Sequence, residues 1–308
     1  AALAGTARAQ PSLDFLGSFS TSSMSGDGSV LAGSTSSGFV RWTQATGVVN
    51  IGGSTGSGQA AVSRDGQAIS GTAIDPMINF SEMSLWQGGT SWLPLGFIGG
   101  LSGTNVSSGW GINDDGTSVV GLGWWSANEA HAVQWTQGGT LVDLGSTVVM
   151  RSSRANCVNG DGSIVAGWQD STTGFRQGAI WVNGVQQVLL DDTMVPLGEV
   201  QNINSAGDVL CGAGGGGSGG GWVKTPAGVS RVGVLPGFEQ VSCETDVTED
   251  GSVAVGFSVQ LTSRRGFAWT PTGGMVPIED YLLSKGVPVP VGANLNTPVA
   301  LSDDGSVV

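Results

Sequence analysis

Three tryptophans, Trp124, Trp125 and Trp168, and an arginine, Arg176, are the residues of this chain best suited to hold a ligand. Each tryptophan shortly follows a glycine that closes an apolar run, which places it where a strand gives way to a loop. Indole rings stack on sugar rings or anchor protein partners, and an arginine beside them supplies polar contacts. We therefore predict a ligand-binding rim at these four residues. The competing interpretation is that the rings pack inside the fold, as large aromatic side chains usually do.

Catalytic residues are not predicted. A sialidase-like site would need an arginine cluster, a nucleophilic tyrosine with a nearby glutamate, and a carboxylic acid. The single tyrosine, Tyr281, lies in segment 278–285, whose one apolar stripe predicts a short surface helix, so we expect it to pack or to cap the core. The single histidine, His131, stands in a tryptophan-containing strand without a nucleophile elbow nearby. We expect a non-enzymatic protein.

Metal and cofactor sites are not predicted either. Aspartates recur in short turns, but they lack the spaced oxygen ligands and the terminal glutamate of an EF-hand, so we assign them to turn formation. One histidine and three scattered cysteines do not supply a zinc ligand set. Glycine-rich stretches lack the Gly-Lys-Ser or Gly-Lys-Thr ending of a phosphate loop. We expect no cofactor.

The elements that must position these residues form a repeat. A turn of the form Ser/Asn/Thr-x-Asp-Gly recurs seven times, with Ala206 in place of the aspartate in the fifth copy. An apolar residue stands four positions before every turn glycine. The first side chain of such a turn accepts a backbone hydrogen bond and its glycine takes the left-handed conformation, which predicts a hairpin. The turn glycines are Gly28, Gly66, Gly116, Gly162, Gly207, Gly251 and Gly305.

Each complete repeat continues with a short apolar run, a tryptophan and a further apolar position, often written Leu-Gly. A glycine closes each run, which suits close approach of a neighbouring backbone. The repeat tryptophans are Trp42, Trp86, Trp135, Trp181, Trp222 and Trp269. About four short strands with one large aromatic describe a propeller blade. We predict an all-β fold, a β-propeller of four-stranded antiparallel blades.

The blade count depends on the two ends of the chain. Six complete repeats are present, and the remaining fragments complement each other. Residues 302–308 contain a seventh turn and the start of its inner strand, and residues 13–17 resemble the Leu-Gly strand of a blade. We predict seven blades, the last one split between the termini, and six blades as the alternative. One propeller domain then spans residues 11–308, truncated at its C-terminus, and residues 1–10 are a signal-peptide remnant or a disordered terminus.

The best copies of the repeat cover residues 112–121 and 247–256 and lead to Trp135-Thr136 and Trp269-Thr270. The full pattern is an apolar residue, the acidic turn, an apolar run ending in glycine, then Ala-x-x-Trp-Thr and Leu-Gly. It resembles the HAF family of bacterial extracellular repeats over nearly the whole chain. The resemblance implies a secreted or cell-surface bacterial protein, often joined to an anchoring or autotransporter segment. It implies no family-wide activity.

Charge and composition limit the possible partners. The formal net charge is −13 and the 11 lysines and arginines are dispersed, which argues against nucleic acid and against an anionic membrane surface. We expect a monomer without direct membrane insertion, whose partner is a protein or a glycan. The expected function is a non-enzymatic interaction module. A carbohydrate-binding or carbohydrate-processing propeller and a passive passenger of an autotransporter-like protein are the alternatives.

Overall fold

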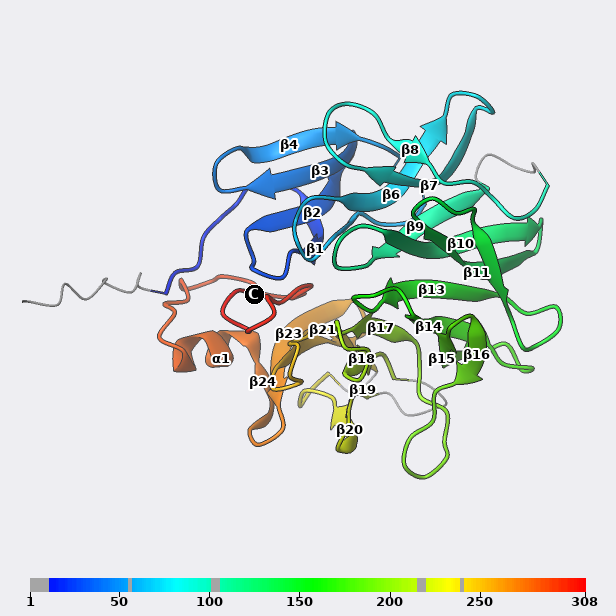
Figure 1. The fold of residues 1–308 in the computed structure, drawn as a ribbon. Coiled ribbons are helices and arrows are strands. Elements are labelled where there is room, and N and C mark those ends of the chain that lie inside the picture. Colours follow the sequence, from blue (N-terminus) through cyan, green and yellow to red (C-terminus); the bar gives the residue numbers. More distant parts are fainter. Residues whose placement is uncertain (1–10, 55–56, 101–105, 215–219, 239–240) are drawn as a thin grey trace, which may run out of the picture.

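The structure is a computed structural model that describes residues 11–54, 57–100, 106–214, 220–238 and 241–308. These residues form a ring of six sheets around a central axis (Figure 1), which confirms the predicted all-β propeller of four-stranded antiparallel blades. The C-terminus lies beside β1, between the first blade and the last (Figure 1). The predicted signal remnant or disordered terminus, residues 1–10, lies outside the described residues.

Every blade is a meander in which each strand pairs with the next one in the sequence. The first blade contains β1 (Ser20–Met24), β2 (Val30–Thr35), β3 (Gly38–Thr43) and β4 (Gly47–Gly52); the second, β5 (Ala61–Val62), β6 (Ile69–Asp75), β7 (Phe80–Trp86) and β8 (Leu93–Pro94); the third, β9 (Ser107–Ile112), β10 (Ser118–Ser126), β11 (Glu129–Thr136) and β12 (Val142–Gly145). The fourth contains β13 (Ser153–Val158), β14 (Ile164–Asp170), β15 (Arg176–Val182) and β16 (Val185–Val188); the fifth, β17 (Val200–Ile203), β18 (Leu210–Gly212), β19 (Gly221–Thr225) and β20 (Gly228–Gly233); the sixth, β21 (Val241–Val247), β22 (Ala254–Gln260), β23 (Ser263–Thr270) and β24 (Gly274–Pro277).

One helix, α1 (Ile278–Ser284), follows the sixth blade and buries Ile278, Tyr281 and Leu282. Tyr281 is 9% exposed and shares a core with Val255 and Ala268 of that blade, as predicted for a packing or capping aromatic. In the described part of the chain, no helix is long and apolar enough to cross a membrane.

The turn chemistry explains why the first two strands of each repeat form a hairpin. All seven turn glycines have φ between 68° and 82°, the left-handed region that favours glycine. In the first turn, Ser25 Oγ accepts a hydrogen bond from Val30 N at 3.0 Å, and Asp27 Oδ1 accepts one from Ser29 N at 3.0 Å. The hydroxyl and amide of Ser29 hold the pKa of Asp27 below its usual value. The Asp27 carboxylate therefore accepts hydrogen bonds within its own turn and stabilises that turn.

Neighbouring turns bind one another on the face of the ring that we call the turn face. Backbone bonds join the first turn to the second, Gly26 N to Arg64 O at 2.9 Å, and the fourth to the fifth, Gly160 N to Ser205 O at 3.0 Å. The seventh turn takes part as well. Asp303 N donates to Gly26 O at 2.8 Å, so the last turn of the chain closes the ring onto the first.

The repeat tryptophan is the wedge between blades, packing against the blade that precedes its own. Trp222 of the fifth blade, fully buried, shares a core with Cys157 and Ala166 of the fourth. Trp181 is also fully buried, and its indole Nε1 donates to Leu144 O of the third blade at 3.0 Å. Burial of the large indole ring, together with the hydrogen bond that its N–H donates, fixes the angle between adjacent blades.

The preferred prediction of seven blades is wrong for the described residues, which form the six-bladed alternative. Residues 13–17 and the residues after Gly305 form no strand. The physical reason is that a strand needs a paired neighbour, and among the described residues neither segment is paired within a sheet. That turn is nonetheless built like the others, with Val307 N donating to Ser302 Oγ at 2.9 Å.

The wedge role predicts a graded response to truncation of the repeat tryptophans. Trp181→Ala should lower the free energy of unfolding by about 3–5 kcal/mol, the usual cost of emptying a large buried aromatic site. Trp42→Ala should cost clearly less, because Trp42 is only partly buried. Urea unfolding followed by circular dichroism measures both; equal losses would contradict the wedge account.

Candidate binding site

The four residues predicted to form a rim fall into two separate clusters. Trp124 and Trp125 end β10, whereas Trp168 and Arg176 belong to β14 and β15 of the next blade. All four lie at the strand ends remote from the turns, on the face that we call the loop face. Trp168 is only 5% exposed, whereas Trp125 is 53% exposed. The packing interpretation therefore fits Trp168, and Trp125 retains a surface for a ligand.

Trp125 stands at a bulge where β10 and β11 shift register between Trp124 and Ser126. Bulges redirect a side chain out of the regular alternation of a strand. The indole of Trp125 stacks on the imidazole of His131, with ring centroids 6.0 Å apart and planes 9° apart. One face of the indole thus lies toward His131, and about half of the Trp125 side chain remains exposed to solvent.

Two carboxylates fix His131 in turn. Its Nδ1 lies 2.9 Å from Asp143 Oδ2, and its Nε2 lies 3.4 Å from Glu129 Oε1. The hydrogen bond to Asp143 raises the pKa of His131 above its ordinary value, against the opposing effect of partial burial. Trp125, His131, Glu129 and Asp143 form what we call the Trp125 platform, an exposed aromatic ring beside carboxylate oxygens.

The second cluster stacks two arginines on two tryptophans. The guanidinium carbon of Arg176 lies 4.1 Å from the centre of the Trp168 ring. That of Arg154 lies 3.7 Å from the centre of the Trp110 ring and 5.4 Å from that of Trp168. Such cation–π contacts strengthen as the groups lose water.

Glu199 bridges both arginines across the junction of the fourth and fifth blades. Its Oε1 accepts from Arg154 Nη2 at 2.6 Å and from Asn156 Nδ2 at 2.9 Å, and its Oε2 accepts from Arg176 Nη1 at 2.7 Å. Burial lowers the pKa of Arg154, opposed by the charge of Glu199. Because one carboxylate binds both guanidinium groups, this cluster ties two blades together.

The sequence indicates the role of Glu199 only when consecutive repeats are compared. Arg154 and Glu199 each stand eight residues before the turn glycine of their repeat, Gly162 and Gly207. Equivalent positions of consecutive repeats face each other between blades, so opposite charges there predict an ion pair. The same rule finds Asn202 and Asp246, each five residues before its turn glycine and joined by a hydrogen bond.

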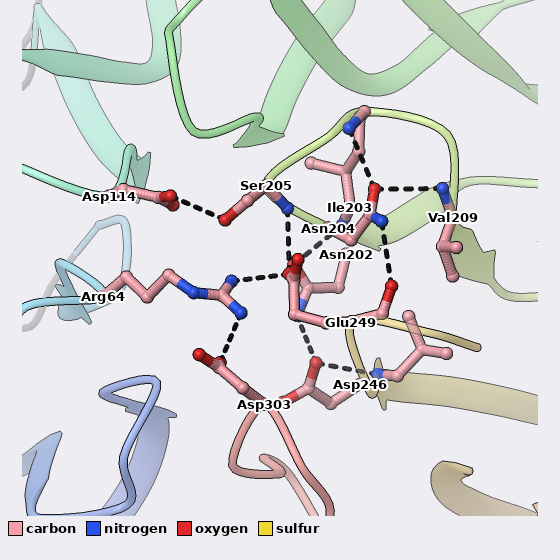
Figure 2. A network of polar contacts seen from close by, with 12 residues as sticks. Arg64, Asp114, Asn202, Ile203, Asn204, Ser205, Val209, Asp246, Glu249 and Asp303 are labelled. Atoms are coloured by element: carbon pink, nitrogen blue, oxygen red, sulfur yellow. Dashed lines mark hydrogen bonds and ion pairs between the residues drawn. The ribbon is translucent and has the colours of Figure 1, made fainter. Parts of the chain in front are cut away.

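On the turn face, a network of polar contacts joins side chains of several turns (Figure 2). Arg64 binds Glu249 Oε1 through Nη1 and Asp303 Oδ1 through Nη2, both at 2.6 Å. Ser205 Oγ donates to Asp114 Oδ2 at 2.6 Å and Ser205 N to Glu249 Oε1 at 2.9 Å. These contacts join the second, third, fifth, sixth and seventh turns.

Behind this network lies a cavity of about 310 Å³ lined by the inner strands. Asp246 lines it, and burial raises the pKa of this carboxyl to about 6. Both of its oxygens already accept hydrogen bonds: Oδ1 from Asn202 and from Val247 N, and Oδ2 from Leu301 N at 2.6 Å. The carboxyl therefore holds the sixth blade to its neighbours.

No protein-family model matches the chain, and no curated protein matches it. Among solved structures, the chain is similar to TolB from Acinetobacter baumannii, with 11% identity over 84% of this chain and 63% of that one and a TM-score of 0.51. It is also similar to the β-propeller domain of the Trilobed protease from Pyrococcus furiosus, with 13% identity over 85% of each chain and a TM-score of 0.54. Hydrazine synthase from Kuenenia stuttgartiensis is 15% identical over 99% of this chain and 94% of that one, with a TM-score of 0.56. These likenesses show the β-propeller fold and carry no activity to this chain.

The single histidine makes the platform directly measurable. Proton NMR of the His131 ring should give a pKa above about 6.5, and Asp143→Asn should lower it, whereas Asp14→Asn, at an exposed site elsewhere, should not. Because the folded-state pKa is raised, protonated His131 adds stability that is complete below about pH 6.5 and lost as the pH rises through the folded value. A pKa unchanged by Asp143→Asn would contradict this geometry.

Glu199→Gln should destabilise the protein strongly, because it leaves the buried guanidinium of Arg154 without its countercharge. Breaking a buried pair costs about 3–5 kcal/mol. The matched control is Glu279→Gln, which removes a more exposed pair with Arg265 at 3.9 Å and should cost at most about 1 kcal/mol. Denaturant unfolding compares the two variants, and similar losses would show that Glu199 does not tie the blades.

Proposed function

We propose that this protein is a non-enzymatic binding module of the bacterial cell surface or extracellular space, and that it binds a neutral glycan at the Trp125 platform. The observation that carries the proposal is the exposed indole of Trp125, supported from behind by His131. A fixed, half-exposed aromatic ring is the surface on which the apolar face of a sugar stacks. The resemblance of the repeat to HAF proteins supports the extracellular location.

The groups around the ring favour this class of ligand. Carboxylates such as those of Asp143 and Glu129 accept hydrogen bonds from hydroxyl groups. Their side chains are 31% and 25% exposed, so a sugar beside the ring can reach them. The formal net charge of −13 repels acidic glycans, which leaves neutral sugars as the better fit. The rigid blades hold the platform, and specificity then resides in the loops around it.

A glycan array probed with the protein tests the proposal. Wild type should retain one or more neutral glycans, Trp125→Phe should keep measurable binding, and Trp125→Ala should weaken it at least about tenfold, since truncating such an anchor costs roughly 2 kcal/mol or more. The matched control is Phe15→Ala, which removes another exposed aromatic ring, 87% exposed, away from the platform.

Three outcomes would contradict the proposal. Binding that Trp125→Ala leaves unchanged places the ligand elsewhere on the propeller. If no glycan is retained, the protein is not a glycan-binding module, and the result favours the alternative of a passive passenger of an autotransporter-like protein. Turnover of a bound glycan, tested by chromatography of the products, would replace the binding module by the carbohydrate-processing alternative.

A further inference from the structure

We propose that a pocket between the fourth and fifth blades binds a small amphipathic anion, a medium-chain alkyl carboxylate, with the carboxylate at Lys224. The pocket is separate from the Trp125 platform, whose residues do not line it, and the inference does not depend on the proposed function. We call it the Lys224 pocket, defined by Ile164, Ile180, Leu189, Leu210 and Lys224.

The walls of the Lys224 pocket are aliphatic. Ile164, Ile180 and Leu189 line it from the fourth blade and the segment after it, and Leu210 lines it from the fifth blade. These side chains pack with Trp222 in one hydrophobic cluster, so the core holds the walls in place. The volume of about 360 Å³ lies near the lower end of the roughly 300–1,000 Å³ common for small-ligand pockets. The walls therefore suit a short alkyl chain.

Comparison of the repeats explains why space remains at this junction. The residue before the repeat tryptophan is Arg41 in the first blade and Gln134 in the third. Each donates to the carbonyl oxygen of the turn glycine of the next blade, at 3.3 Å and 2.8 Å respectively. In the fourth blade this residue is Ile180, which is shorter and cannot donate such a bond, and here the pocket extends to Gly207, the turn glycine of the fifth blade.

Lys224 supplies the positive charge of the pocket. It lies two residues after Trp222 on β19, and alternation along the strand places both side chains toward the fourth blade. The other blades carry no charge at this position, where they have Gln44, Gly88, Gln137, Asn183 and Pro271. Lys224 is partly buried, and within the described parts of the chain its ammonium group has no ion pair or hydrogen bond. An ammonium group beside apolar walls favours an anionic partner.

The other charges near the pocket make the selection depend on this lysine. Asp208 also lines the pocket, but it is exposed, and its Oδ1 accepts a hydrogen bond from Asn204 Nδ2 at 2.9 Å. The formal net charge of −13 disfavours anions over most of the surface. An anion that prefers this pocket must therefore be held by Lys224 and by the aliphatic walls together. A carboxylate at the end of a short alkyl chain meets both requirements.

Three ligands of equal chain length and different charge test the proposal on the full chain. Isothermal titration calorimetry at pH 7 should show saturable binding of octanoate at one site, and octanoate should raise the thermal midpoint of the protein. Octanol should bind at least about tenfold more weakly, because it lacks the charge-assisted hydrogen bond to Lys224. Octylamine, which carries a positive charge, should show no detectable binding.

Variants at charged positions locate the carboxylate. Lys224→Met keeps the length of the side chain and removes its charge, so it should weaken octanoate binding at least about tenfold and leave octanol binding unchanged. The matched control is Lys285→Met at the other lysine of the chain, which lies beside Tyr281 and should bind octanoate like wild type. Asp208→Asn should strengthen octanoate binding, because it removes a like charge from the lining.

A variant that fills the pocket tests the alkyl site. Ile180→Gln introduces the residue that the third blade has at this position, with a longer side chain that can donate to Gly207 O. It should weaken octanoate and octanol alike, whereas Lys224→Met affects octanoate alone. Circular dichroism and cooperative urea unfolding check that the variant folds like wild type.

The two lysines also allow a direct spectroscopic readout. Reductive methylation with ¹³C-formaldehyde keeps the positive charge and labels both side chains. Octanoate should shift the NMR signal of Lys224, identified by its loss in Lys224→Met, and should leave the signal of Lys285 in place.

Any of three results would overturn the proposal. The first is the absence of saturable octanoate binding. The second is octanol binding as tightly as octanoate, which would show that no cation recognises the carboxylate. The third is octanoate binding that Lys224→Met leaves unchanged, which would place the anion elsewhere on the propeller.

Discussion

Hydrogen bonds between neighbouring turns set the spacing of every blade. Each turn uses its own side chains to close a hairpin, which leaves backbone groups free to bind the next turn around the axis. Asn113 Nδ2 completes the step from the third turn to the fourth by donating to Gly160 O at 3.0 Å, and Asn204 Nδ2 does so from the fifth to the sixth, donating to Glu249 O at 3.0 Å. The ring is thus a closed chain of short contacts, and the tryptophan wedges and the central cavity take their positions from it.

The same ring explains how the two aromatic clusters differ. Trp168 lies on β14 between blades, where the two arginines stacked on it both bind Glu199, so its contribution is stability. Trp125 lies beyond the last regular pair of β10 and β11, where the bulge turns it outward. The hairpin formed by β10 and β11 therefore carries Trp125 beyond the rigid part of the blade. The aromatic ring stays at the surface and is not buried between blades.

Much of the architecture could be predicted from local chemistry. The turn glycines, the repeat tryptophans and the four strands per blade follow from residue types at fixed spacing. The close approach predicted for the run-closing glycines is confirmed at Gly121 and Gly167, where a Cβ would overlap the carbonyl oxygens of Ser108 and Arg154. These are short-range constraints, which a single sequence records well.

The errors concern contacts between repeats. The prediction of seven blades assumes that the seventh turn implies strands around it, yet a turn can join the ring without them. The rim residues were grouped by equivalent position, which did not reveal that Trp168 is covered by Arg176 while Trp125 is held by His131. Such outcomes depend on what the neighbouring blade or hairpin supplies, and they become predictable only when equivalent positions are compared across consecutive repeats, as for Arg154 and Glu199.

Amide hydrogen exchange at the turns tests the closed ring most directly. If the seven turns form one hydrogen-bonded ring, the amides of Gly26 and Asp303, which carry the closure, should exchange as slowly as those of Asp65 and Gly160 within the ring. Fast exchange at Gly26 and Asp303 beside slow exchange at Asp65 and Gly160 would show that the ring is open between its first and last blades, and would contradict the account.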